Sequence, residues 1–107
     1  MQFEELKKEI QDFGIKTIRK DENSYFEAVV VKDRLEQLAQ RLEGIFGSPV
    51  WPSEKELSAK ISSIVENFGG IRDGQTLYLW QEKDFYIFAM LWPWSDGVNI
   101  TLKIGRE

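Results

Sequence analysis

A turn signal near the C-terminus constrains the fold of this chain most. Asp96-Gly97 lies between two apolar segments, residues 85–92 and 98–104. Asp-Gly between apolar runs is the strongest short-range signal for a β-hairpin. Another strand-like segment, residues 76–81, precedes this pair after a short polar connection. The three segments together predict an antiparallel β-meander at the C-terminal end of the chain.

Two stretches in the N-terminal half have apolar residues at the helical spacing of three and four. The first ends at Gly14, and the second begins near Asp33 and ends at Gly47. Glycine is typical of helix ends because it readily adopts the left-handed conformation found there. The apolar positions of the two stretches are Phe3, Leu6, Ile10 and Phe13, and then Leu35, Leu38, Leu42 and Ile45.

A third helix is predicted to begin at Ser53 and to end at Gly69. Ser53 and Glu56 have the spacing of a capping box, in which two side chains satisfy the free amides of a helix N-terminus. Its predicted apolar face consists of Leu57, Ile61, Ile64, Val65 and Phe68.

The remaining segments complete the predicted fold class. Residues 25–31 have the β-branched and aromatic content of a strand, and residues 15–20 fit either a loop or an additional first strand. The order is therefore αβαα followed by a three-stranded meander, without βαβ alternation. This order predicts a single α+β domain over residues 1–107, built as a two-layer sandwich.

The middle segment of the meander departs from the pattern expected of such a sandwich. A strand with one face toward helices and one toward water alternates apolar and polar residues, as residues 98–104 do. In residues 85–92 both faces are apolar. One face has Phe85, Ile87, Ala89 and Leu91, and the other has Tyr86, Phe88, Met90 and Trp92.

The turn decides which of these faces meets the helices, and two registers remain open. A two-residue loop pairs Ser95 with Val98 and places Leu91 on the apolar side of the last strand. A three-residue loop with Gly97 in a bulge pairs Trp94 with Val98 and reverses the faces. In either register the second face has an apolar centre, which needs a cover from the chain's own helices or from a partner.

The aromatic content of the meander favours a partner. The chain has 14 aromatic residues, and seven of them lie between residues 76 and 94. Aromatic residues are enriched at interface cores. We therefore expect a small protein-interaction module that binds a second copy of itself or another protein. The predicted contact residues are Tyr86, Phe88, Met90, Trp92 and Trp94.

The alternative is a small-ligand-binding domain. In that interpretation Trp51, Trp80 and Trp92 line an apolar pocket between the helices and the sheet.

Composition argues against most catalytic chemistry. The chain has no cysteine and no histidine, and therefore no thiol nucleophile and no imidazole base. We expect no carboxylate inside an apolar run, where burial would raise its pKa for acid–base work. We expect no cofactor and no metal site, and the composition argues against an enzymatic activity.

Charge and hydropathy narrow the partners further. The net charge is −4, whereas proteins that bind a phosphate backbone usually have a basic stripe, so nucleic acid is not the expected partner. The first residues lack the apolar core of a secretion signal. The longest apolar run, residues 85–94, has half the length that a membrane-spanning helix needs. These features predict a cytoplasmic protein that does not enter membranes.

Overall fold

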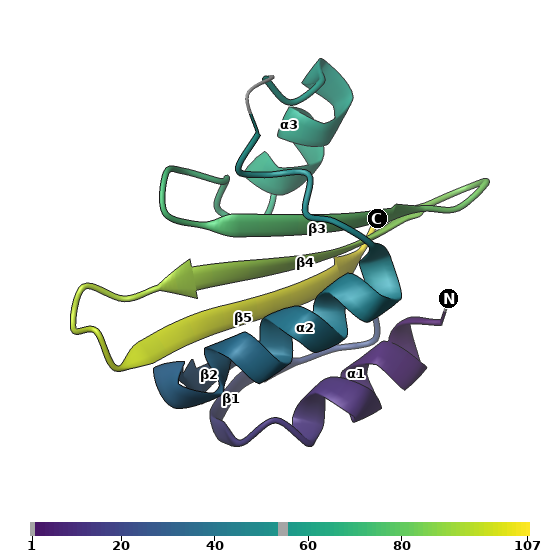
Figure 1. The fold of residues 1–107 in the computed structure, drawn as a ribbon. Helices are drawn as coiled ribbons and strands as arrows, with labels where there is room; N and C mark the ends of the chain where they lie inside the picture. The colour runs from purple at the N-terminus through teal and green to yellow at the C-terminus, as the bar shows by residue number, and fades with distance from the viewer. Residues whose placement is uncertain (1, 54–55) are drawn as a thin grey trace.

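The computed structural model describes residues 2–53 and 56–107. The described chain is an α+β domain in which helices pack on an antiparallel sheet (Figure 1). In chain order its elements are α1 (Phe3–Gln11), β1 (Ile15–Asp21), β2 (Tyr25–Val31), a 3-10 turn (Lys32–Arg34), α2 (Leu35–Phe46), α3 (Ala59–Glu66), β3 (Thr76–Gln81), β4 (Tyr86–Pro93) and β5 (Asn99–Arg106).

The sheet has the strand order β1-β2-β5-β4-β3, and each neighbouring pair is antiparallel. The predicted meander is confirmed as β3, β4 and β5. The segment that fitted either a loop or a strand forms β1, which pairs with β2 as a hairpin. Because β2 pairs with β5, this N-terminal hairpin extends the sheet beyond the last strand of the meander.

The hairpin between β4 and β5 has the register of the two-residue alternative, with Leu91 opposite Leu102. The Asp96 carboxylate stabilises this turn. It accepts hydrogen bonds from the backbone N–H of Val98 at 2.9 Å and of Asn99 at 3.0 Å. A turn residue whose side chain bonds the backbone two residues later holds a tight reversal.

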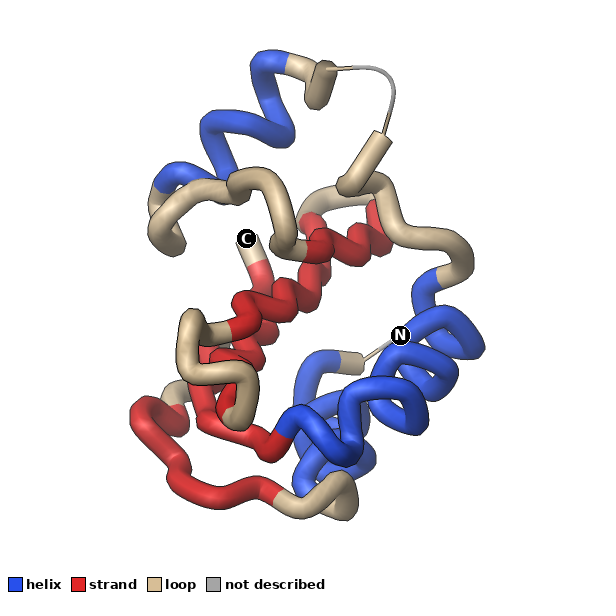
Figure 2. The backbone as a smooth tube through the Cα atoms, turned by 60° about the vertical axis from the view of Figure 1, so that its left-hand side comes forward, coloured by secondary structure: helices blue, strands red, loops and turns tan. Residues whose placement is uncertain are grey.

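The helices are divided between the two faces of the sheet. Figure 2 shows the strands running between α3 on one side and α1 and α2 on the other. The core under α1 and α2 contains Ala89 and Leu91, and the core under α3 contains Phe88 and Met90. The sequence predicted that the helices form a single layer, but β4 is apolar on both faces, and α3 covers the second face.

The predicted start of the third helix is wrong. Helix α3 begins at Ala59, and its N-cap is Ser58, whose side-chain oxygen accepts a hydrogen bond from the N–H of Ile61 at 3.3 Å. Glu56 precedes the helix, and residues 54–55 of the predicted capping box lie outside the described residues. The helix also ends earlier than predicted, at Glu66 with Asn67 as its C-cap. The two glycines lie just beyond it, and Gly70, with a positive φ of 78°, donates its N–H to the carbonyl of Val65.

No helix of the described residues is long and apolar enough to cross a membrane.

Candidate functional site

Three of the predicted contact residues lie in the core beneath α3. Phe88 and Met90 are fully buried, and they pack with Ile64 and Val65 of the helix. Tyr86 is partly buried beside the same cluster. The structure therefore covers this part of the second face with the chain's own helix, and Phe88 and Met90 are not accessible to a partner while α3 is in place.

The other two predicted contact residues lie at the end of β4, on the same face. Trp94 is 39% exposed, and its indole N–H donates to the hydroxyl of Thr101 at 2.7 Å. Trp92 lies directly opposite Thr101 and is partly buried. Its indole nitrogen is buried and has no hydrogen-bond partner among the described residues. The structure thus brings Trp92 and Trp94 together around one threonine.

The three tryptophans of the ligand-pocket alternative are not brought together. Trp51 bridges to Leu77 at the outer edge of β3 and contributes to the core under α3. Trp80 lies on the opposite face, since it pairs with Ile87, a residue of the core under α1 and α2. Trp51, Trp80 and Trp92 therefore do not line one pocket.

Lys103 of β5 holds a charge in a largely buried position. The residue is 8% exposed, and its ammonium lies 3.3 Å from the centre of the Trp92 ring. The same ammonium donates to the backbone carbonyl of Phe68 at 2.7 Å. Burial lowers the pKa of Lys103, the carboxylate of Glu27 opposes this, and the cations Arg19 and Lys20 lower it further. Lys103 therefore joins β5 to the segment that follows α3.

Glu27 of β2 is a second charged residue on this face. Its side chain is 17% exposed, and it accepts a hydrogen bond from the hydroxyl of Tyr25 at 2.6 Å. Arg19 lies 3.7 Å from its other oxygen. Burial raises the pKa of Tyr25, and the hydrogen bond to Glu27 raises it further. The expectation that no carboxylate lies within an apolar run is wrong at Glu27, which is in the middle of β2.

A cleft of about 450 Å³ opens between these residues and the loop after α3. We name it the Lys103 cleft. The aromatic rings of Tyr25 and Phe68 stack beside it with their centroids 5.2 Å apart. The residues that matter for its chemistry are Lys20, Tyr25 and Glu27 from the first hairpin, Phe68 and Gly69 from the loop, and Lys103 from β5.

Sequence reasoning missed this cleft because its residues come from distant parts of the chain. The signals that were available are Glu27 within the apolar segment 25–31 and Lys103 on the polar side of the last strand. Only the pairing of β2 with β5 places the two residues opposite each other.

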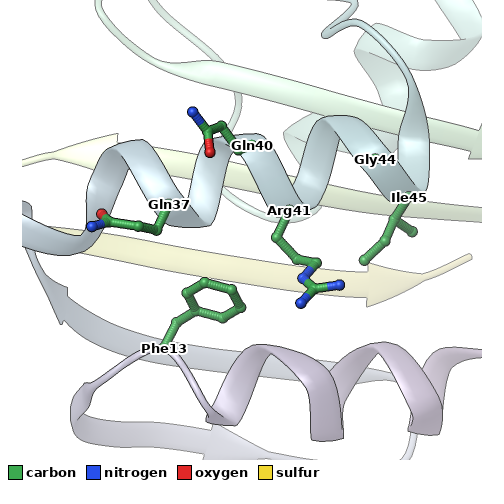
Figure 3. Close-up of a pocket in the computed structure, with 6 residues that line it drawn as sticks. All are labelled: Phe13, Gln37, Gln40, Arg41, Gly44 and Ile45. Carbon is green, nitrogen blue, oxygen red and sulfur yellow. The ribbon is translucent and has the colours of Figure 1, made fainter.

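A second hollow lies between α1 and α2 on the other face (Figure 3). It measures about 460 Å³, and Phe13 and Arg41 point into it from the two sides. Arg41 is already paired with Glu9 at 2.9 Å. The remaining polar groups are the side-chain amides of Gln37 and Gln40. This groove has no unpaired charge or buried polar group that would favour a particular ligand.

No cluster of three or more carboxylates that could hold a metal ion occurs within residues 2–53 and 56–107. Comparisons of the chain with protein-family models, with curated proteins and with solved structures found no match. The functional argument therefore depends on the side chains of this protein alone.

Proposed function

We propose that the chain is a non-enzymatic protein-interaction module that self-associates through the second face of its sheet, with the contact centred on Trp94. The observation that supports this proposal is the exposure of Trp94 at the point where the cover provided by α3 ends. Tryptophan is among the residue types that contribute most to binding energy at interfaces. Its neighbour Trp92 enlarges the aromatic surface.

The charges around Trp94 are compatible with a second copy as the partner. Asn99, which lies beside Trp94 in the hairpin, is hydrogen-bonded to Lys16 at 3.1 Å and to Asp96 at 2.7 Å. A two-fold symmetric contact sets a patch against its own copy. A patch with both signs of charge allows Lys16 of one copy to face Asp96 of the other, whereas a patch with one sign would repel itself.

Pairing through the β1 edge of the sheet is a less favourable route to a dimer, and the opposite edge, β3, is partly covered at Leu77 by the bridge from Trp51. The edge strand β1 carries Lys16, Arg19 and Lys20, and its pairing with β2 is interrupted by two register shifts. Two such strands side by side would bring like charges together, and basic residues and bulges are common means of protecting sheet edges. The proposed dimer therefore uses the face of the sheet.

The test is the molar mass in solution, measured by analytical ultracentrifugation from low micromolar to near-millimolar concentration. Trp94→Glu is compared with Trp80→Glu, because Trp80 is similarly exposed (38%) on the opposite face. We expect the wild-type mass to rise toward that of a dimer, Trp94→Glu to remain monomeric, and Trp80→Glu to behave as the wild type. A monomeric wild type at every concentration, or association that Trp94→Glu leaves unchanged, would overturn the proposal.

A further inference from the structure

We propose that the Lys103 cleft binds a small molecule that carries a single carboxylate, and that this carboxylate pairs with the ammonium of Lys103. The proposal concerns a site separate from the Trp94 contact, and it does not require self-association. It depends on the charges, the free hydrogen-bonding capacity and the room at the cleft.

The buried ammonium of Lys103 has no counter-ion among the described residues. A buried ammonium is costly unless an opposite charge accompanies it. Glu27 is directly opposite Lys103 in the sheet, but its carboxylate is bonded to Tyr25 and close to Arg19. Within the described part of the chain, no carboxylate lies within ion-pair distance of the Lys103 ammonium. The charge of Lys103 is therefore left for a ligand.

The ammonium of Lys103 also has unused hydrogen-bonding capacity, because a lysine ammonium has three donors and no acceptor. One donor is used by the carbonyl of Phe68, and the face of the Trp92 ring occupies another side of the nitrogen. Lys103 also lines the cleft. A carboxylate oxygen in the cleft would take the remaining donor and form a charge-assisted hydrogen bond.

The charged side chains around the cleft favour a ligand with a single negative charge. Lys20 lines the cleft together with Lys103, and the positive charges of Arg19 and Lys20 both lower the pKa of Lys103. An anion in the cleft would reduce the repulsion among these cations. Glu22 and Glu27 also line the cleft. Because these two carboxylates offset two of the three cations, about one unit of positive charge remains for a ligand, which a monocarboxylate neutralises and a phosphate dianion exceeds.

Gly69 explains how the loop comes close enough to build the cleft. Its φ is +102°, and a Cβ at this position would lie 2.4 Å from the Trp92 ring and 3.1 Å from the Lys103 nitrogen. Only a residue without a side chain fits here. The glycine therefore allows the carbonyl of Phe68 to approach the ammonium and fixes the wall of the cleft beside it.

The experiment is a titration of the protein at neutral pH, followed through the amide and indole signals of ¹H–¹⁵N NMR spectra. The probes are sodium acetate and sodium benzoate, with sodium phosphate and sodium chloride at matched ionic strength as comparisons. We expect saturable shifts with at least one carboxylate at the signals of Trp92, Phe68 and Gly69, and much weaker binding of phosphate. The absence of saturable shifts with both carboxylates, or equal shifts with chloride, would overturn the proposal.

Variants connect the binding to its residues. Lys103→Met keeps a flexible, unbranched side chain and removes its charge, and we expect it to weaken carboxylate binding about tenfold or more. Lys20→Met should weaken it several-fold. Lys60→Met is the matched control, because Lys60 lies over the Tyr86 ring at 5.2 Å but does not line the cleft.

Unchanged binding by a folded Lys103→Met variant would contradict the inference. If Lys103→Met fails to fold, the exposed Lys20→Met variant decides, because a several-fold loss supports the inference and an unchanged affinity overturns it.

Discussion

Glu27 and Lys103 lie directly opposite each other on β2 and β5, yet they do not form an ion pair. Glu27 is bonded to Tyr25 within its own hairpin, and Lys103 is bonded to Phe68 and covered by Trp92. The two charges therefore hold different parts of the molecule. Glu27 orders the first hairpin, whereas Lys103 attaches the loop after α3 to the sheet and keeps an unneutralised cation at the cleft.

The buried charge of Lys103 should appear in the pH dependence of stability. The pKa of Lys103 is lowered in the folded protein, whereas in the unfolded chain it has its ordinary value of 10.5. At a pH between these two pKa values the unfolded chain binds more protons than the folded chain. The free energy of unfolding of the wild type should therefore rise relative to that of Lys103→Met as the pH increases toward 10.5. Urea denaturation of both proteins at neutral and alkaline pH measures this difference, and a constant or falling difference would contradict the assignment.

Two glycines should respond to alanine in opposite directions. At Gly69 the positive φ and the contact with Trp92 make a Cβ unfavourable, and Gly69→Ala should lower the free energy of unfolding by about 1–3 kcal/mol. Gly44 lies within α2, and a Cβ there would meet nothing within 4 Å. Gly44→Ala should therefore stabilise the protein by about 0.5–1 kcal/mol. Thermal and urea unfolding followed by circular dichroism compare the two variants with the wild type.

The attachment of α1 to β1 should depend on Lys7 and Asp21. The ammonium of Lys7 donates to the Asp21 carboxylate at 2.7 Å, and this bond raises the pKa of Lys7. Asp21→Asn should lower the free energy of unfolding by about 1 kcal/mol, since Asp21 is half exposed. Glu22→Gln is the control, because Lys7 contacts the backbone carbonyl of Glu22. Equal losses in the two variants would contradict this account.

The contribution of Lys7 should also depend on pH, in the opposite sense to that of Lys103. The pKa of Lys7 is higher in the folded protein than its ordinary value of 10.5 in the unfolded chain. The stabilisation from Lys7 is therefore complete below pH 10.5 and is lost as the pH rises through the pKa of the folded protein. The free energy of unfolding of the wild type relative to Asp21→Asn should therefore fall in strongly alkaline solution.

Asp96 should contribute to stability above acidic pH. Hydrogen bonds from the N–H groups of Val98 and Asn99 hold the pKa of Asp96 below its ordinary value of 3.8. The contribution of Asp96 to the free energy of unfolding is therefore present above pH 3.8, and it is lost as the pH falls through the pKa that Asp96 has in the folded protein. Asp96→Ala should be less stable than the wild type at neutral pH, and the difference should close in acid. Asp96→Asn, which keeps a side-chain oxygen, should retain more stability than Asp96→Ala at neutral pH.

The elements of the fold were largely predictable from local patterns, because apolar spacing and glycine ends are local properties. The predicted start of α3 is wrong because Ser53 and Ser58 are both suitable N-cap residues, and the capping-box spacing of Ser53 and Glu56 favours the earlier serine. The register of the last hairpin is not decided by the sequence, because Ser95-Asp96-Gly97 fits both a two-residue loop and a three-residue loop with a bulge.

The candidate site was less predictable, for a physical reason. Apolar residues on both faces of β4 indicated a second covered face, but its cover was decided by where α3 packs. Residues 86, 88 and 90 are consequently core positions, and Trp94 at the strand end is the exposed member of the set. The cleft depends on the β2–β5 pairing that brings Glu27 opposite Lys103, 76 residues away in the sequence, which no local pattern encodes.

The most direct test of the proposed self-association uses the four tryptophan indole N–H signals in ¹H–¹⁵N NMR spectra recorded over a dilution series. Self-association through Trp94 predicts that the Trp94 signal shifts with concentration, that Trp92 follows it more weakly, and that Trp80 remains constant, because Trp80 lies on the opposite face of the sheet. Four signals that are independent of concentration, or a Trp80 signal that shifts as much as that of Trp94, would contradict it.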